Sequence, residues 1–178
     1  MRILITSGGT EEKIDQVRRI TNVSSGQTGL YLAEQLASMG HTIYFVRALK
    51  APSFSQATVE KTFETSDDLI NAIQSILDTN LIDVVIQCAA VSDFSVDKLV
   101  INGEIFEPDS ISKMDSRDQV EIVLKSRPKI ITQIKTMSQH SAPIVVGFKL
   151  TNTNELEDRL DQIFKLSKHP EVDFVVHN

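Results

Sequence analysis

The amino-acid sequence predicts a doubly wound α/β protein, with a mostly parallel, Rossmann-like sheet that carries an inserted β-hairpin flap. Short apolar runs of strand length alternate with amphipathic segments that have the period of helices. Parallel strands need crossover connections, which are usually helical, so this alternation is typical of βαβ units. The third quarter differs, because Asn102-Gly103 separates two strand-like runs within residues 98–107. Such a pair is the strongest local signal for a hairpin turn.

The predicted elements follow one another with short connections. Strands are expected at residues 3–6, 42–46, 58–63, 84–88, 121–124, 144–148 and 174–176. Helices are expected near residues 26–39, 67–77 and 155–168, and another beyond Pro128 that carries Ile130, Ile131, Ile134 and Met137. Gly40 suits the end of the first helix, since glycine accepts the left-handed backbone found there. Ser66 is the expected cap of the second helix.

Length and charge limit the function. The 178 residues, 41% of them hydrophobic, are enough for one globular domain, residues 1–178, with a sizeable core. A net charge of -6 argues against a general nucleic-acid or membrane-surface binder. No apolar run approaches the roughly 20 residues of a transmembrane helix, and a strand rather than a signal peptide opens the chain, so we expect a cytoplasmic protein. A final strand without a covering helix suggests that a C-terminal segment is missing.

Cysteine and histidine give no metal site. The single cysteine, Cys88, excludes an intrachain disulfide or a cysteine cluster, and its place at the end of an apolar run favours a core residue. The four histidines are too scattered for a zinc pattern.

The segments that follow the predicted strands carry the candidate chemistry, because ligands of open α/β sheets bind beyond the carboxyl ends of the strands. These segments are Ser7 to Thr10, Ala89 to Asp93, Gly147 to Lys149, and Asn178. Gly8 and Gly9 let backbone N–H groups approach a phosphate. A second turn, residues 24–29, precedes the first helix, whose N-terminus offers further donors. Two donor sets suit an extended anion.

Each of these features also has a purely structural interpretation. A glycine pair after a strand is often only a turn, and Ser24-Ser25 is a plausible helix cap. Asn22, Asp93 and Lys113 are residue types common in turns and on solvated surfaces. The residues alone therefore predict a nucleotide-type site without naming its ligand.

In combination, the motifs resemble the phosphopantothenate–cysteine ligase family, also called the phosphopantothenoylcysteine synthetases, in its short monofunctional bacterial form. Residues 5–19 are similar to the family's glycine-rich opening, and residues 20–29 to its asparagine-containing turn. Residues 89–94, 146–148 and 173–178 follow in the family's order. Lys113 to Ser116 aligns with the family's flap motif, whereas Gln27, Lys149 to Thr151 and His177 depart from the commoner residues.

The resemblance implies a reaction in coenzyme A biosynthesis. The carboxylate of 4'-phosphopantothenate is activated by CTP, with Mg²⁺, to an acyl-cytidylate, and the amine of L-cysteine then opens this anhydride. Asn22 and Lys113 are the implied catalytic residues, Asn22 orienting the pantothenate and Lys113 stabilising charge in the second step. The implied nucleotide-binding residues are Gly8, Gly9, Thr10, Ala90, Asp93, Phe148 and Lys168, and the implied substrate-binding residues are Asn22, Ser25 and Gly26. A homodimer is also implied, in which the flap covers the partner's site.

Two alternatives remain at this stage. The first is an NADP-dependent reductase, because Arg47 follows the second strand and would meet a 2'-phosphate. The G-x-G-x-x-G turn is absent, however, and neither Tyr31 nor Tyr44 has the lysine four residues later that short-chain reductases use. The second is a noncatalytic nucleotide-binding module.

Overall fold

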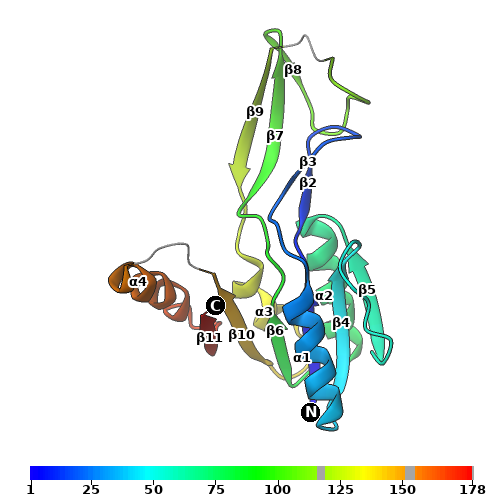
Figure 1. The fold of residues 1–178 in the computed structure, drawn as a ribbon, viewed down its shortest axis with the longest axis vertical. Coiled ribbons are helices and arrows are strands. Elements are labelled where there is room, and N and C mark those ends of the chain that lie inside the picture. The colour runs from blue at the N-terminus through cyan, green and yellow to red at the C-terminus, as the bar shows by residue number, and fades with distance from the viewer. Residues whose placement is uncertain (116–118, 151–154, 178) are drawn as a thin grey trace.

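The computed structural model describes residues 1–115, 119–150 and 155–177 and is built on a six-stranded parallel sheet (Figure 1). The strand order is β11-β10-β6-β1-β4-β5, and every neighbouring pair is parallel. The strands are β1 (Arg2–Ser7), β4 (Thr42–Ala48), β5 (Val59–Phe63), β6 (Val84–Gln87), β10 (Ile144–Lys149) and β11 (Phe174–His177). The chain winds outward from β1 to β5 and then returns to β6 on the other side of β1. The predicted doubly wound sheet is confirmed, and its order reverses between β1 and β6.

Helices cover both faces of this sheet. Helix α1 (Gln27–Ser38) places Leu30, Ala33, Leu36 and Ala37 against Ile3, Ile5, Ile43 and Phe45. The opposite face is packed by α2 (Ser66–Thr79), the 3-10 helix η1 (Ile130–Thr132) and α3 (Ile134–Met137), whose apolar side chains share one core with Leu4, Val46 and Val85. Helix α4 (Leu156–Ser167) lies on this second side, since Leu166 and Ile131 both approach Gly147. The core is thus split by the sheet into two layers.

Helix α2 begins at Ser66, the predicted cap, so its actual N-cap lies one residue earlier. The N-cap is Thr65, whose hydroxyl accepts from the Asp68 N–H at 3.1 Å while the Asp68 carboxylate accepts from the Thr65 N–H at 2.9 Å. This reciprocal capping box satisfies two backbone donors. Ser66 is not the cap, because it is the first helical residue and donates instead to the buried Glu12 carboxylate.

An arm extends from the sheet and carries the predicted hairpin (Figure 1). We define the arm as β2 (Glu11–Lys13), β3 (Arg19–Thr21), β7 (Phe94–Ile101), β8 (Glu104–Phe106), β9 (Val120–Ser126) and the described loops that join them. The hairpin turn is confirmed, since Asn102 and Gly103 have φ of 51° and 89°, the positive values that a type I′ turn requires. Strand β9, predicted as residues 121–124, pairs antiparallel with β7, so the flap has three strands.

Two segments differ from the expectation. Residues 11–21, where no strand was predicted, form the antiparallel pair β2–β3. The helix expected beyond Pro128 is reduced to η1 and the single turn of α3. Five of the seven residues from Ile130 to Thr136 are β-branched, and such side chains lose χ1 freedom in a helix.

Several apolar side chains near β11 are exposed. Ile144, Phe174 and Val176 lie on the part of the sheet beyond α1, and Leu150 follows β10.

Within the described residues, none of the helices has both the length and the apolar composition needed to cross a membrane.

We expect Thr65→Ala to lower the free energy of unfolding by about 1 kcal/mol, because it removes the cap of α2. The matched control is Thr79→Ala, an exposed threonine at the other end of the same helix. Urea unfolding at neutral pH measures both variants. Equal losses in the two would contradict a specific capping role for Thr65.

Candidate functional site

The loops that follow β1 and β6 are joined to each other at the point where the sheet order reverses. The Ala90 N–H donates to the Gly8 carbonyl at 2.8 Å, and the Thr10 N–H donates to the Ala90 carbonyl at 3.1 Å. Gly9 and Ala90 are therefore paired in a parallel bridge. These bonds extend the pairing of the two central strands past their ends and fix the predicted glycine pair against the Ala89-Ala90 segment.

Asn22 is brought to this junction by the return of the arm to the sheet. Its Nδ2 donates to the Val91 carbonyl at 2.9 Å. A Cβ atom at Gly9 would overlap the Asn22 backbone carbonyl oxygen, so only glycine permits this approach. The hydroxyl of Thr10 accepts from the Ser92 N–H at 3.0 Å and holds the same loop from the other side. Asn22 itself is exposed at the rim.

The second small-residue turn places the N-terminus of α1 over the end of β1. Gly26 is the N-cap with φ of 76°, and the Ser7 hydroxyl donates to its carbonyl at 2.8 Å. A Cβ at Gly26 would come within 2.7 Å of the Ala51 Cβ and 2.9 Å of the Ser7 Oγ. The N-cap residue makes no side-chain hydrogen bond, and the Gln27 N–H reaches the Ser25 hydroxyl at 3.4 Å. The first turn of α1 is directed at the rim, where the helix dipole favours an anion.

Two cavities lie beside these loops. The glycine cavity, of about 170 Å³, is bounded by Gly8, the second turn and the start of α1. Its lining residues are Gly8, Val23, Ser24, Ser25, Gly26, Gln27, Thr28, Gly29, Cys88, Ala89, Ala90, Phe148 and Leu150. The lysine cavity, of about 250 Å³, lies between the Ala89 to Asp93 loop, η1 and α4. Ala89 and Phe148 line both cavities, which therefore meet at a shared wall.

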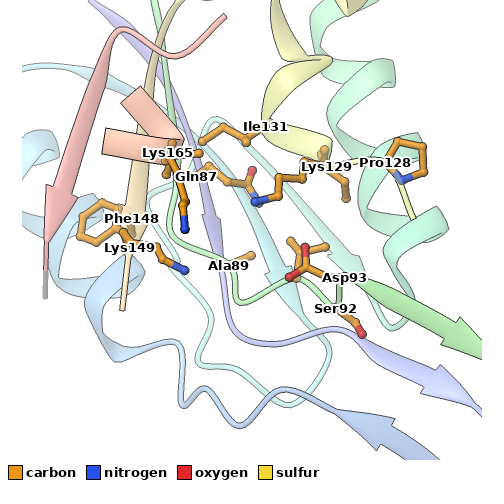
Figure 2. A pocket seen from close by; sticks show the side chains of 13 residues that line it. Gln87, Ala89, Ser92, Asp93, Pro128, Lys129, Ile131, Phe148, Lys149 and Lys165 are labelled. Carbon is orange, nitrogen blue, oxygen red and sulfur yellow. The ribbon is translucent and has the colours of Figure 1, made fainter. Parts of the chain in front are cut away.

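The lysine cavity is basic (Figure 2). Lys129, Lys149 and Lys165 line it, against one carboxylate, that of Asp93. Figure 2 shows the amino groups of Lys149 and Lys165 directed into the space beside the Gln87 amide. Among the described residues none of the three lysines has an ion-pair partner. Ala89, Ile131 and Phe148 add apolar surface. A planar apolar group bearing negative charge matches this lining.

The structure brings most of the predicted site residues together. Those at the junction or in the cavity walls are Gly8, Gly9, Thr10, Asn22, Ser25, Gly26, Ala90, Asp93 and Phe148. Lys168 is not among them: it ends α4, is exposed and lines neither cavity, whereas Lys165 on the preceding turn does. Asn178, and Ser116 and Thr151 of the quoted motifs, lie outside the described residues. Gln87, Lys129 and Lys165 were not predicted.

Cys88 lines the glycine cavity but is unsuited to nucleophilic chemistry. Burial raises the pKa of its thiol to about 12. The side chain therefore stays protonated at neutral pH, and only the thiolate is a strong nucleophile.

Lys113 lies apart from the junction, in the arm between β8 and β9. Its side chain is exposed, and the next residue, Met114, packs in the arm's own core with Ile14, Val96 and Leu99. The segment before it is also held by the loop between β2 and β3. The Asp109 N–H donates to the Ile14 carbonyl and the Gln16 N–H to the Ile111 carbonyl, each at 3.2 Å. In this chain Lys113 is not brought to either cavity.

A buried carboxylate anchors the segment that carries Lys113. Asp15 is fully buried and accepts from the Val17 and Arg18 N–H groups at 2.8 and 2.6 Å and from the Arg18 guanidinium at 2.5 Å. The Met114 N–H approaches it at 3.4 Å, and Arg18 donates to the Met114 carbonyl at 3.2 Å. Burial alone would raise the pKa of Asp15, but these hydrogen bonds, led by that from the Arg18 N–H, hold the pKa below the usual aspartate value.

Comparison with known proteins identifies the family and agrees with the fold. The family described as DNA/pantothenate metabolism flavoprotein C-terminal domain matches residues 1–178. The Coenzyme A biosynthesis bifunctional protein CoaBC of Thermococcus kodakarensis is 33% identical in an alignment of length 178 that covers 99% of this chain and 41% of that protein. The chain thus spans less than half of that relative.

Two solved structures have the same fold. The DNA/Pantothenate Metabolism Flavoprotein from Streptococcus pneumoniae superposes with a TM-score of 0.81 at 27% identity, over 100% of this chain and 82% of that one. A Cab2 mutant in complex with phosphopantothenate-cysteine gives a TM-score of 0.73 at 19% identity, over 99% and 72%. The second likeness concerns the fold alone.

We expect Asp15→Asn to lower stability at neutral pH, because one carboxylate oxygen accepts from the Val17 and Arg18 N–H groups and the other from the Arg18 guanidinium and the Met114 N–H, and an amide has only one accepting oxygen. A carboxylate with a depressed pKa contributes stability fully above the unfolded aspartate pKa of about 3.9 and loses it as the pH falls through the folded pKa. The difference between wild type and variant should therefore shrink below about pH 4.

Urea unfolding across this pH range is the measurement, with Asp97→Asn as control. Asp97 pairs with Lys125 on the surface of the same arm, and an exposed pair contributes at most about 1 kcal/mol. A pH-independent difference for Asp15→Asn would contradict the assignment.

Proposed function

This chain belongs to the DNA/pantothenate metabolism flavoprotein C-terminal domain family, and from that premise we propose that it is a phosphopantothenate–cysteine ligase of coenzyme A biosynthesis. The observation that carries the proposal is the pair of cavities that meet at Ala89 and Phe148 on the carboxyl rim of the sheet. A ligase of this class must hold two phosphorylated substrates with their reacting ends in contact, and adjoining anion-binding compartments provide for that. The relative from Thermococcus kodakarensis, 33% identical, is named as a coenzyme A biosynthesis protein, which supports the proposal.

In the proposed first step, the carboxylate oxygen of 4'-phosphopantothenate attacks the α-phosphorus of CTP. A P–O bond to the acid forms, the bond to the bridging oxygen of the β-phosphate breaks, and pyrophosphate leaves. In the second step the nitrogen of L-cysteine attacks the acyl carbon, loses a proton and displaces CMP, so that an amide remains. The protein's part in such phosphoryl chemistry is mainly alignment and neutralisation of charge.

The glycine cavity is the proposed seat of the reacting phosphates. Gly8 provides backbone without a side chain in the cavity wall, and Ser25 and Gly26 lie at the N-terminus of α1. Gly9 and Thr10 hold the adjoining loop against Ala90. Backbone N–H groups and the helix dipole stabilise the charge that develops on the phosphate oxygens. The base and ribose then extend past Ala90 and Phe148 toward Asp93 in the lysine cavity. Lys165 replaces Lys168 as the proposed phosphate contact from α4.

Mg²⁺ is proposed to enter with the nucleotide. This ion commonly binds through substrate phosphates and waters together with one or two carboxylates, and the phosphates in the glycine cavity would supply most of its ligands, since Asp93 lies on the wall of the lysine cavity beside the proposed ribose. When bound, the ion would neutralise phosphate charge. Orientation of the substrates and the rest of the charge stabilisation are proposed to come from the side chains and backbone amides of the protein.

Asn22 is proposed to orient the acid and its acyl-nucleotide. Because its Nδ2 is engaged by the Val91 carbonyl, the side-chain oxygen is held at the rim, where it can accept a hydrogen bond from the pantothenate amide or hydroxyl. The Asn22 side chain would then bind the Val91 carbonyl through its nitrogen and the acid through its oxygen.

Lys113 is proposed to act on the partner's site in a homodimer. It lies in the arm, next to Met114 in the segment that Asp15 anchors, and lines neither cavity of its own chain. The arm also exposes apolar side chains, Val17, Ile105, Ile122 and Leu124, which suit contact with another protein. A lysine brought by the partner would stabilise negative charge in the second step and keep water from the anhydride.

The reductase alternative loses its main support. Arg47 is paired with Glu60 at 2.8 Å and donates to the carbonyls of Ala48, Leu49 and Ala51. A guanidinium held in this way is already satisfied by the protein and has little capacity left for a 2'-phosphate. The noncatalytic module differs from the ligase only in turnover, so an activity assay separates them.

We expect pyrophosphate release when the protein is given 4'-phosphopantothenate, L-cysteine and Mg²⁺ with CTP, and less with ATP. Asn22→Asp should reduce pyrophosphate release at least tenfold, because the carboxylate repels the acid. Lys113→Gln should leave pyrophosphate release measurable and abolish amide formation. The two products are measured separately, and wild-type levels of both in both variants would overturn the site. Wild-type protein without any pyrophosphate release would favour the noncatalytic module.

Mixing the two variants tests the position of Lys113. If Lys113 serves the partner's site, a heterodimer of Asn22→Asp and Lys113→Gln chains has one site with both residues intact. Mixed equally, the variants should then regain roughly a quarter of wild-type amide formation, since half of the dimers would carry one working site of two. No recovery after verified subunit exchange, or a monomeric active protein, would contradict the proposal.

A further inference from the structure

Gln87 occupies an unusual position at the end of β6. Its side chain is 6% exposed, and neither atom of its amide has a hydrogen-bond partner among the described residues. The residue lines the lysine cavity, and Figure 2 shows its amide in the cavity wall between the side chains of Lys129 and Lys165. Most buried polar side chains in folded proteins are paired, so an orphaned amide facing a cavity needs an explanation.

The two strand neighbours of Gln87 leave its side chain as the one that lines this part of the cavity wall. Gly147 is the register partner of Gln87 on β10 and contributes no side chain. A Cβ there would come within 2.5 Å of Ile131 Cδ1 and 3.3 Å of Leu166 Cδ2. The side chain on the other neighbour, Thr6, already accepts from the Ala89 N–H. Gln87 therefore lies in the cavity wall next to Gly147, which has no side chain to occupy the neighbouring space.

A buried amide without partners destabilises the protein that carries it, unlike an apolar side chain of the same length. Its neighbours Lys129 and Lys165 have long side chains that move by rotation about their χ angles. A nucleotide whose negative charge draws these amino groups aside would uncover the Gln87 amide, and its base would supply the missing partners. The unpaired amide thus points to a ligand with an adjacent donor and acceptor, which the edges of nucleobases present.

We infer that Gln87 is a specificity-determining residue that hydrogen-bonds the base of a nucleotide held in the lysine cavity. The inference rests on the proposed function for the identity of the nucleotide, and it assigns the base to the floor of that cavity between Phe148 and Ile131. The carbonyl oxygen of Gln87 accepts from one group on the edge of the base, and its Nε2 donates to the neighbouring acceptor.

The first test compares the stability of the unliganded protein with that of Gln87→Met. Methionine keeps the length of the side chain and removes the orphaned amide, so the Tm should rise by about 2–4 °C. The matched control is Gln74→Met, because the Gln74 amide donates to Asp78 and to the Met137 carbonyl outside the cavities. Its Tm should fall. A fall in Tm for Gln87→Met as well would mean that the amide is satisfied structurally, and would overturn the inference.

The second test measures nucleotide selectivity. Binding of CTP, UTP, ATP and GTP is measured by calorimetry for wild type, Gln87→Met and Gln74→Met. Gln87→Met should bind the preferred nucleotide about 5- to 100-fold more weakly and the others almost as before, so that discrimination collapses. An equal loss for all four nucleotides, or no loss, would overturn the inference.

The outcomes separate this inference from the proposed function. Wild-type ligation with unchanged selectivity in Gln87→Met would sink only the base-reading role of Gln87. Selective nucleotide binding that depends on Gln87, without amide formation by the wild type, would sink only the ligase activity. Wild type that binds none of the four nucleotides would overturn both.

Discussion

The backbone contact between Gly9 and Ala90 is the constraint on which the site depends. The two loops beyond β1 and β6 exchange backbone hydrogen bonds there, and Asn22 can approach them closely only because Gly9 has no side chain to meet the Asn22 carbonyl. That contact fixes Asn22, the Ala89 to Asp93 loop and, through Ser7, the start of α1 in one arrangement. Both cavities take their walls from these segments, so the chemistry proposed for them rests on backbone geometry more than on any single charged side chain.

The main sheet could be predicted from the sequence because each of its elements has a strong local signal. The apolar runs of β1 and β4 and the amphipathic periods of α1 and α2 are confirmed within a few residues. The pair β2–β3 escaped prediction because its strands have three residues each, most of them charged or polar, and their stability comes from packing on the rest of the arm. The short η1 and α3 show the opposite case, in which β-branched side chains outweighed an apolar spacing that suits a helix.

The site was predictable to the extent that glycine-containing turns and strand ends mark it. Lys165 and Lys168 both lie near the end of α4, and which of them reaches the cavity depends on the rotation of that helix against β10, which the sequence does not specify. Gln87 carried no signal either, since a polar residue at the end of an apolar run is ordinary. Only the burial of its amide sets it apart. Lys113 was placed by resemblance, and its distance from the junction follows from the buried Asp15 and Met114, which hold the surrounding segment to the arm.

The shared wall formed by Ala89 and Phe148 has a thermodynamic consequence for any pair of ligands that fill the two cavities. A shift of this wall by the first ligand alters the affinity for the second, and linkage requires the same factor in the reverse direction. A single molecule that spans both cavities would meet its second compartment at a high effective concentration and would bind much more tightly than either fragment. Because of this wall, the binding free energies of ligands in the two cavities are coupled, so that filling one cavity changes the affinity of the other.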